Sequence, residues 1–544
     1  MFIEPVFGKK FFGREEVLAT LQKRANAIKG GYRQNLALTG SMLSGKSSIL
    51  RHFLKTIKDS DIIPVYVEMT GRGFDAFCLR FMATLLYQYL RAEGGRTEND
   101  FDSLKDLCRG KLSATVLEMD LIREALNQKK WDDAYEMLLD LSNTFKAESG
   151  KNCIVILDEF HNLSNFRLKK PFQTFGKFIM LQKNTMYIVT SSQKTLLKDI
   201  LAKKLSLLFG NFEVMEINGF DNQTARSFIT DKINDITVSE NIKSYMIQVS
   251  QGNPFYLETI LKRFSTLIRT KGDTADTKEC ILDTLADLLY DSDGILNQYF
   301  TNNINFFIEK KNRKKFIPIL VSLAKGNSRI KSIQDDLGKV DKDLGSKLNN
   351  LLHMDLIRKN GVFYNIQDKL FEFWLKNVYS LKRDAVVDDM DIKYLEFKNL
   401  AENDFREYCE FNSKSISDVV RDLFSSFRNE RVCVSMHERV LPFFETVKCR
   451  RMPANISSIT GRTRKNGWLC HIKQNDMADE QNISTLAGRR TDDGGTKITR
   501  KIIIPLKGID HNAFLLAKEH NIWVWDLQQL NNILRLFGKF ELVI

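Results

Sequence analysis

A nine-residue loop that follows a short apolar run constrains this chain more than any other feature. Residues 35–39 predict a buried strand, and the loop after it has the spacing G-x-x-x-x-G-K-S. Glycines at Gly40 and Gly45 let backbone N–H groups turn inward toward phosphate oxygens, where a Cβ would obstruct them. A helix expected from Lys46 to Ile57 adds the positive end of its dipole. The pattern predicts a phosphate-binding loop made of Gly40, Ser41, Met42, Leu43, Ser44, Gly45, Lys46, Ser47 and Ser48.

Two acids end a second apolar run and predict a metal site. The run at 153–157 leads into Asp158 and Glu159, and a strand so apolar is typical of a parallel sheet buried on both faces. Its carboxyl end is where open α/β sheets bind their ligands. A core strand that ends in a solvated acidic turn is the alternative, which the loop at 40–48 disfavours. The expected roles are contact with the β- and γ-phosphates of ATP for Lys46, Mg²⁺ ligation for Ser47 and Asp158, and orientation of the attacking water for Glu159.

A third strand, at 186–190, is followed by Ser191 and Ser192. Either hydroxyl could bond the γ-phosphate or the water, and capping of the next helix is an equal alternative. A further strand at 62–69 and a helix at 74–90 complete an alternation that indicates a parallel α/β sheet. Residues 95–148 carry no strand signal, and we expect them to be helical.

Composition limits the remaining choices. The length of 544 residues predicts three or four domains, and 43% hydrophobic with 27% charged residues is typical of a globular protein in water. The chain has no run of eighteen apolar residues and no visible secretory signal, so we expect no membrane span and no secretion. Its eight cysteines form no C-x-x-C pair, which favours reduced thiols in a cytoplasm and disfavours a zinc site. The net charge of +13 favours a polyanionic partner, although a solvated lysine-rich surface would give the same value.

Five motifs in order resemble the AAA+-related ATPases of the archaeal-type and STAND groups. The resemblance implies a helical lid after the core and a nucleotide site that includes Gly13, Arg14 and Pro254. One departure is Asn211, which stands where those families carry an arginine that could complete a neighbouring subunit's site. Lys203 or Lys204 could substitute, but a lysine lacks the planar fork of an arginine, so oligomerisation is possible while an efficient oligomeric motor is disfavoured. The motifs are Phe12-Gly13-Arg14-Glu15, Gly45-Lys46-Ser47, Asp158-Glu159-Phe160, Ser191-Ser192 and Gly252-Asn253-Pro254.

A smaller helical pattern occupies residues 313–379. Three helices, at 316–323, 330–338 and 344–354, precede two short strands around the turn Asn360-Gly361, which is the order of a winged helix. In such domains the third helix enters the major groove of DNA and the wing touches the backbone. Docking to a protein is the alternative use. The basic residues expected to serve DNA are Lys339, Lys342, Lys347, Arg358 and Lys359.

The last segment, 390–544, is expected to be a second α/β unit that resembles the restriction-endonuclease-like fold. Such nucleases hold Mg²⁺ with an Asp and a Glu/Gln-x-Lys strand. Here His471 replaces the acid two residues before Lys473, and Glu445 is the only acid in the strand expected before it. We therefore expect an inactive nuclease fold, in which the basic stretch at 450–465 could still hold phosphates.

The expected domains are an ATPase core at 1–220, a helical lid at 221–310, a winged helix at 311–385 and the C-terminal α/β domain at 390–544. The predicted fold class is α/β, with a P-loop NTPase parallel sheet core. The predicted function is an ATP-binding and ATP-hydrolysing switch that couples its nucleotide state to a DNA or protein partner. The alternatives are an ATP-gated DNA nuclease and a scaffold that holds ATP without hydrolysing it.

Overall fold

The computed structural model describes residues 4–69, 73–205, 212–272, 275–338, 341–384, 389–434, 437–452, 456–492 and 495–544. The chain forms two compact units. The first contains residues up to Phe220 together with Asn253–Phe255, and the second contains the remainder. None of the helices in these described ranges is long and apolar enough to cross a membrane.

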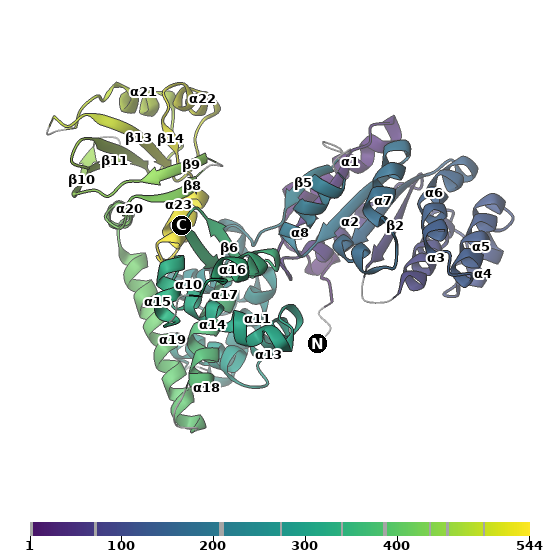
Figure 1. Ribbon diagram of the computed structural model, residues 1–544, viewed down its shortest axis with the longest axis horizontal. Coiled ribbons are helices and arrows are strands. Elements are labelled where there is room, and N and C mark those ends of the chain that lie inside the picture. The colour runs from purple at the N-terminus through teal and green to yellow at the C-terminus, as the bar shows by residue number, and fades with distance from the viewer. Residues whose placement is uncertain are drawn as a thin grey trace. The chain divides into compact units, whose positions relative to one another are not determined.

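The first unit is built on a five-stranded parallel sheet in the order β2-β3-β4-β1-β5 (Figure 1). The three inner strands are buried along their whole length, because helices cover both faces of the sheet. The predicted parallel α/β core is confirmed. The strands are β1 (Asn35–Thr39), β2 (Ile62–Glu68), β3 (Asn152–Asp158), β4 (Thr185–Ser191) and β5 (Phe212–Glu216).

Two helices cover one face of this sheet and three cover the other. α1 (Glu15–Ala27) and α2 (Lys46–Thr56) pack on the face that carries Leu36 and Ile156. α3 (Phe74–Ala92), α6 (Trp131–Ser149) and α7 (Pro171–Leu181) pack on the face that carries Ala37 and Val155. The other α-helices described wholly within this unit are α4 (Phe101–Cys108), α5 (Ser113–Asn127) and α8 (Lys194–Asp199).

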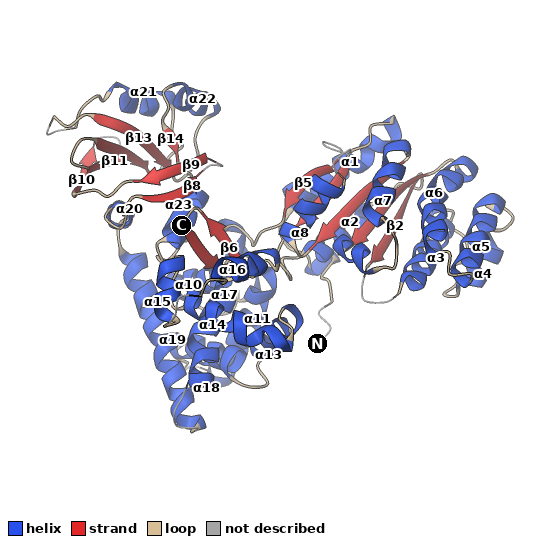
Figure 2. Ribbon diagram, in the orientation of Figure 1, coloured by secondary structure: helices blue, strands red, loops and turns tan. Residues whose placement is uncertain are grey.

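The second unit opens with helices and continues into the predicted set of three helices and a hairpin (Figure 2). The hairpin strands β6 and β7 are antiparallel, and Gly361 in their turn has a φ of 59°, which suits glycine. The opening helices are α9 (Asn222–Lys232), α10 (Glu240–Ser250), α11 (Pro254–Lys271), α12 (Thr277–Leu285) and α13 (Ile295–Phe307). They are followed by α14 (Arg313–Ala324), α15 (Ile330–Asp336), α16 (Leu344–His353), β6 (Ile357–Asn360), β7 (Phe363–Ile366), α17 (Lys369–Trp374) and α18 (Ser380–Asp384).

The C-terminal part of this unit carries a second five-stranded sheet in the order β10-β11-β12-β13-β14. The first three strands are antiparallel, and the last two pairings are parallel. Its strands are β10 (Thr446–Met452), β11 (Ile456–Arg462), β12 (Gly467–Lys473), β13 (Ile498–Pro505) and β14 (Trp523–Val524), and a separate hairpin contains β8 (Glu430–Val434) and β9 (His437–Leu441). The helices are α19 (Met390–Ser413), α20 (Ile416–Phe424), α21 (Glu480–Gly488), α22 (His511–Glu519) and α23 (Leu527–Leu536).

The sequence did not reveal β9, β11, α20 or α21. As a result, the strand directly before β12 was expected at 443–448. In the structure that strand is β11, at Ile456–Arg462, which pairs with β12. β11 contains no acidic residue.

Candidate nucleotide site

The loop after β1 adopts a conformation that depends on its glycines. Gly45 has a φ of 94°, and Leu43 is also left-handed with a φ of 60°. A Cβ on Gly40 would lie 2.4 Å from the carbonyl oxygen of Ile217 and 2.8 Å from Ser44 Oγ. Alanine at Gly40 would therefore force the loop away from its neighbours, which explains the glycine spacing physically.

Lys46 begins α2 and points back along the loop. Its Nζ donates to the carbonyl oxygens of Gly40 at 3.0 Å and Ser41 at 2.8 Å, and the side chain is buried. Burial lowers the pKa of Lys46, an effect that the carboxylates of Glu159 and Asp158 oppose. The ammonium group therefore faces both the loop and the two predicted acids.

Ser47 and Asp158 are 111 residues apart in the sequence and are joined by a hydrogen bond. Ser47 Oγ donates to Asp158 Oδ2 at 2.8 Å. Tyr66 from β2 donates to the same oxygen at 2.5 Å, and Thr190 from β4 donates to Oδ1. The carboxylate is thus fixed by one neighbouring strand on each side, and its bond to Ser47 places both expected Mg²⁺ ligands together.

Glu159 follows in a left-handed conformation, with a φ of 56°, and turns toward the end of β4. Its Oε2 accepts from the backbone N and from Oγ of Ser192, both at 2.9 Å. His161 Nδ1 lies 3.3 Å from the same oxygen and 2.9 Å from Ser191 Oγ. The structure therefore gathers Glu159, Ser191 and Ser192 around His161, a residue that sequence reasoning missed.

The remaining predicted residues surround the loop without all pointing into it. Arg14 donates to the carbonyl oxygens of Ser44 at 3.3 Å and Asn218 at 2.5 Å, so it fastens the loop to the end of the core. Gly13 precedes it with a φ of 65°. Ser48 Oγ accepts from the backbone N of Val6 at 3.0 Å and thus holds the N-terminal segment.

Pro254 is the first residue of α11, and Asn253–Phe255 belong to the same compact unit as the loop. Asn253 Oδ1 accepts from the backbone N of Phe255 at 3.0 Å, which stabilises the helix start. The predicted Pro254 therefore lies in the unit that holds the other site residues.

The donor set suits a phosphate and a divalent cation. Within the described ranges, Ser44 Oγ and Thr39 Oγ1 are buried without a hydrogen-bond partner, and such orphaned hydroxyls are costly unless a ligand satisfies them. The start of α2 has no side-chain cap, so its N–H groups are available to an anion. Hydroxyl and carboxylate oxygens such as those of Ser47 and Asp158 are the ligands that Mg²⁺ prefers.

Three residues discussed for a neighbouring subunit's site have other contacts or cannot be placed. Asn211 lies outside the described residues. Lys203 Nζ pairs with Asp199 at 2.8 Å, and Lys204 lies over the ring of Phe172 at 4.7 Å.

The turn of the hairpin β6–β7, which is expected to touch DNA, is hydrogen-bonded to β8. Val362 N donates to the carbonyl oxygen of Arg431 at 3.2 Å, and the Asn360 side chain exchanges two hydrogen bonds with the backbone of Cys433, at 3.0 and 2.6 Å. Arg358 is half-buried, and burial with Arg535 nearby lowers its pKa to about 9. The turn is therefore held by β8 and Arg358 is partly shielded from solvent, while Val362 in the same turn is 41% exposed, and DNA contact by this hairpin stays a prediction.

The other basic residues expected to serve DNA differ in their surroundings. Lys347 forms an ion pair with Asp341, so part of its charge is neutralised. Lys342 and Lys359 are exposed. Lys339 lies outside the described residues.

The three residues considered for residual nuclease chemistry do not meet. In the strand register, Glu445 lies beside Arg462 and Gly467, at the end of the sheet opposite to His471 and Lys473. Its carboxylate bonds Arg464 at 3.0 Å. Burial and Arg489 lower the pKa of His471 to about 4, and no group of three acid, His or Cys side chains suited to a metal occurs in the described ranges.

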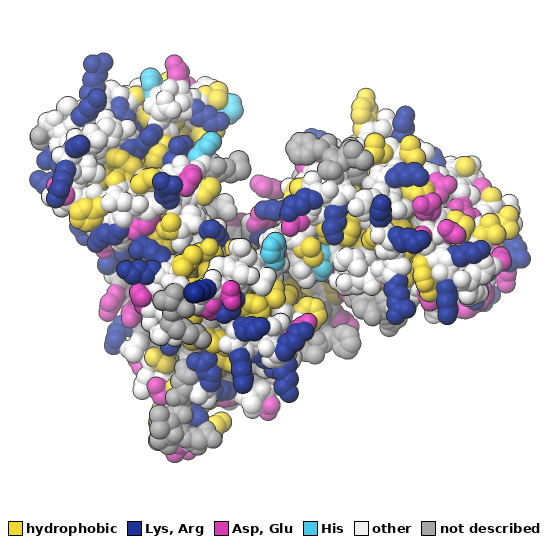
Figure 3. All heavy atoms as spheres, viewed as in Figure 1, with side chains coloured by type: hydrophobic (Ala, Val, Ile, Leu, Met, Phe, Trp, Pro, Cys, Tyr) yellow, Lys and Arg dark blue, Asp and Glu magenta, His cyan; other side chains and the backbone are white. Residues whose placement is uncertain are grey.

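Basic side chains do gather on the C-terminal sheet, where Figure 3 shows Lys and Arg in dark blue. Lys448, Arg450 and Arg451 are exposed on the edge strand β10. Of the predicted basic stretch, Arg450, Arg451, Arg464 and Lys465 are exposed, and Arg462 is half-buried.

Comparison with known proteins gives the class of the core. Residues 10–170, which include the loop and β3, match the family described as AAA ATPase domain. The first unit therefore contains a P-loop ATPase domain of the AAA+ class. No curated protein matches the sequence.

Three solved structures are among those to which the chain is similar. A Walker-type ATPase of Pyrococcus abyssi shares 18% identity with a TM-score of 0.44, over 68% of this chain and 97% of that one. The ORC2 protein of Aeropyrum pernix, in ADPNP–ADP complexes, shares 10% identity with a TM-score of 0.43, over 74% and 98%. The RuvB Holliday junction branch migration motor of Thermotoga maritima shares 12% identity with a TM-score of 0.32, over 68% and 98%.

Proposed function

We propose that this chain binds and hydrolyses ATP with Mg²⁺ and uses the nucleotide state as a switch. The observation that carries the proposal is the bond between Ser47 Oγ and Asp158 Oδ2, at 2.8 Å, beside the loop that contains Lys46. The same three residue types hold the nucleotide phosphates and the metal in P-loop enzymes.

Each residue has a role that follows from its position. Lys46 exchanges its bonds to loop carbonyls for phosphate oxygens, because a charged acceptor is the stronger partner. Ser47 and Asp158 would hold Mg²⁺, which supplies neutralisation of phosphate charge when bound. Glu159 orients water through its carboxylate, and Ser192 fixes that carboxylate through two donors.

Two substitutions test this assignment. Lys46→Ala should weaken ATP binding by about 10-fold to 100-fold, which is the worth of a charge-assisted hydrogen bond. Glu159→Gln should retain ATP affinity and lose phosphate release. Lys23→Ala, an exposed lysine on α1, is the matched control. Equal ATP affinity in Lys46→Ala and the control would refute the site, and phosphate release from wild type no faster than from Glu159→Gln would leave a scaffold that only holds ATP.

We further propose that the second unit carries the output of the switch to a DNA or protein partner. Three helices with a hairpin and the exposed cations of β10 support this role. A switch requires that the affinity for the partner differ between the two nucleotide states, typically by a factor of about 5 to 150. Binding of a labelled DNA duplex with ATP and with ADP tests the DNA form. If the two affinities are equal, capture of proteins by Glu159→Gln loaded with ATP, but not with ADP, would assign the output to a protein partner.

A further inference from the structure

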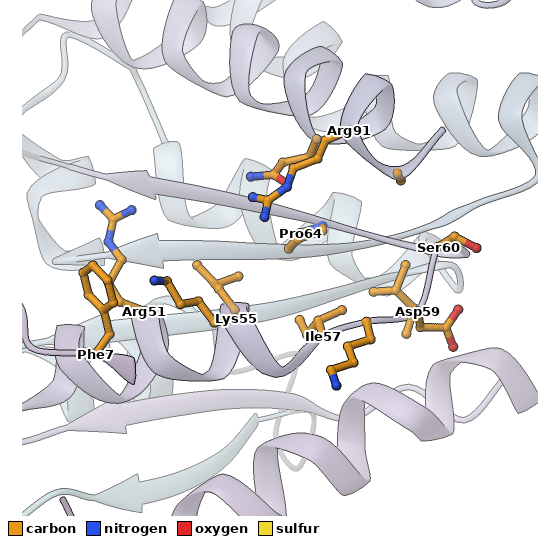
Figure 4. A pocket seen from close by; sticks show the side chains of 13 residues that line it. Phe7, Arg51, Lys55, Ile57, Asp59, Ser60, Pro64 and Arg91 are labelled. Carbon is orange, nitrogen blue, oxygen red and sulfur yellow. The ribbon is translucent and has the colours of Figure 1, made fainter. Parts of the chain in front are cut away.

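A groove runs along the open edge of the first sheet, where β2 is the outermost strand. It consists of two adjoining cavities, of about 490 and 360 Å³, that share Arg51, Leu54, Pro64 and Gln88 in their linings. Figure 4 shows Arg91 extending from one wall toward the strand that carries Pro64, with Arg51 and Lys55 on the other wall. We call this feature the β2 groove.

Cations dominate the β2 groove. Within the described part of the chain, none of the five basic residues that line it belongs to a salt bridge, whereas Asp59 pairs with Lys29 and Glu98 pairs with Arg96. Burial and Asp158 raise the pKa of the third acid, Glu68, an effect that Arg51 and Arg80 oppose. The lining therefore holds five basic side chains against three acidic ones, which leaves an excess of positive charge. The five residues are Arg51, Lys55, Lys58, Arg80 and Arg91.

The edge strand is not suited to continuous strand addition. The backbone oxygen of Asp61 and the backbone nitrogen of Met69 form hydrogen bonds with β3. The backbone N–H and C=O groups of odd-numbered residues of β2 therefore point toward β3, and those of even-numbered residues point toward the open edge. Pro64 lies at one of these outward positions and has no N–H to donate. Recognition in the groove must therefore come from side chains rather than from a backbone ladder.

The groove also differs from a platform for nucleic acid bases. Lys55 Nζ lies 4.0 Å above the ring of Phe7, and the Arg51 guanidinium lies 3.9 Å above the ring of Tyr66. Two of the three aromatic rings in the lining therefore already lie against cations, and Tyr87 is the third, whereas single-stranded nucleic acid uses open rings for stacking. Apolar side chains lie between the cations, among them Leu54, Ile57 and Ala83.

We propose that the β2 groove binds an acidic polypeptide segment in which carboxylates alternate with apolar side chains. Its carboxylates meet Arg51, Lys55 and Arg91, and its apolar side chains contact Leu54 and Ile57. Complementary charge of this kind sets the specificity and the rate of association.

The same groove reaches the nucleotide site through one side chain. Arg51 stacks on Tyr66, whose hydroxyl donates to Asp158. A carboxylate that draws Arg51 off this ring changes the surroundings of Tyr66 and hence the support of a Mg²⁺ ligand. The bound segment therefore regulates ATP hydrolysis, a consequence that rests on the proposed function, whereas binding itself does not.

The test uses fluorescence anisotropy with the full chain and a short labelled peptide that alternates glutamate and leucine. Wild type should bind this peptide and not the version with lysine in place of glutamate. The double variant Arg51→Glu/Arg91→Glu should bind at least about tenfold more weakly. The control Lys23→Glu/Lys177→Glu carries the same charge change on exposed parts of α1 and α7 and should bind as wild type does. Thermal unfolding verifies that both variants are folded.

Two further variants separate binding from its consequence. Lys46→Ala should bind the peptide with wild-type affinity, so failure of the ATP site leaves this result intact. Tyr66→Phe should bind the peptide while its ATP hydrolysis no longer responds to it. Equal peptide binding by Arg51→Glu/Arg91→Glu and wild type overturns the groove assignment. Tighter binding of a single-stranded oligonucleotide than of the peptide, lost in the same variant, overturns the choice of occupant.

Discussion

Asp158 depends on two residues that lie outside any motif. Thr190 Oγ1 donates to Asp158 Oδ1 and accepts from the backbone N of Glu159 at 3.0 Å, so one hydroxyl positions both acids. Tyr66 donates to the other oxygen of Asp158. Partners of this kind orient a metal-binding carboxylate and commonly contribute 10-fold to 100-fold of the metal affinity.

Thr190→Val should therefore raise the Mg²⁺ concentration needed for half-maximal ATP hydrolysis by about 10-fold to 100-fold. The shape of the side chain is kept, so the loss comes from the hydrogen bonds. Thr185→Val is the matched control, because Thr185 is buried at the other end of β4 and bonds Ser142 at 3.0 Å. A Mg²⁺ dependence that is the same in both variants would show that Thr190 does not support the metal site.

His471 makes a separate prediction about pH. Its side chain is 3% exposed, and its folded-state pKa of about 4 lies below the ordinary value of 6.5, because burial and Arg489 disfavour the charged form. As the pH falls, His471 binds a proton in the unfolded chain before it does so in the folded chain. The stability that comes from the neutral, buried imidazole is therefore complete above pH 6.5 and is lost as the pH falls toward 4. The full loss is about 3 kcal/mol.

The measurement is urea unfolding at pH values from 7 to about 4, followed by the fluorescence of tryptophan, to which Trp468, Trp523 and Trp525 contribute. His471→Gln should remove part of the loss of stability in this range. His353→Gln, an exposed histidine on α16, serves as the control. A pH dependence in His471→Gln identical to that of wild type would contradict the prediction.

The sequence predicted the residues whose spacing the chemistry itself fixes. Lys46 and Ser47 follow from the loop pattern, and Asp158 follows from an apolar strand that ends in an acid. Tyr66 and Thr190 could not be found in this way, because their approach to Asp158 results from the order β2-β3-β4 of the sheet. Only the pairing of strands brings them to the site.

At the scale of elements, the hairpin β6–β7 shows that a correct secondary structure does not fix a role. Its strands lie where the sequence predicted them, yet the turn is hydrogen-bonded to β8. β11 was missed for a different reason. Its residues Ser457 and Ser458 are polar in sequence but buried in the middle of the sheet, so neither alternation nor an apolar run marked the strand.

The contact between this hairpin and β8 can be tested with two glycines. A Cβ on Gly361 would lie 1.8 Å from the carbonyl oxygen of Arg431, whereas a Cβ on Gly338 meets nothing within 4 Å. Both residues are left-handed, with φ of 59° and 65°, so alanine at either position carries a similar backbone cost of about 1 kcal/mol.

Gly361→Ala should therefore lose more stability than Gly338→Ala, by about 1–3 kcal/mol, because only the first must separate the turn from β8. Hydrogen exchange of the amides of Val362 and Cys433, which bond across this contact, should be faster in Gly361→Ala alone. Equal exchange in the two variants would mean that the turn and β8 are not held together in solution.

At the scale of the whole molecule, the cations of β10 are one part of the charge of +13, and they have two structural explanations. Cations on an edge strand such as β10 prevent unwanted pairing of sheet edges. The same cations, Lys448, Arg450 and Arg451, would also attract the phosphates of DNA. Dependence on salt distinguishes the two, because only phosphate contacts release counterions.

If β10 contacts DNA, Arg450→Ala/Arg451→Ala should weaken binding of a labelled duplex. It should also lower the slope of log affinity against log salt concentration by about 2, since each phosphate contact contributes about 0.9. Lys169→Ala/Lys170→Ala removes the same charge from an exposed loop of the first unit and should leave the slope nearly unchanged. The contrary outcome is an unchanged slope while the β10 variant associates with itself at high concentration. That result would assign these arginines to protection of the sheet edge, because uncharged edge strands pair with one another.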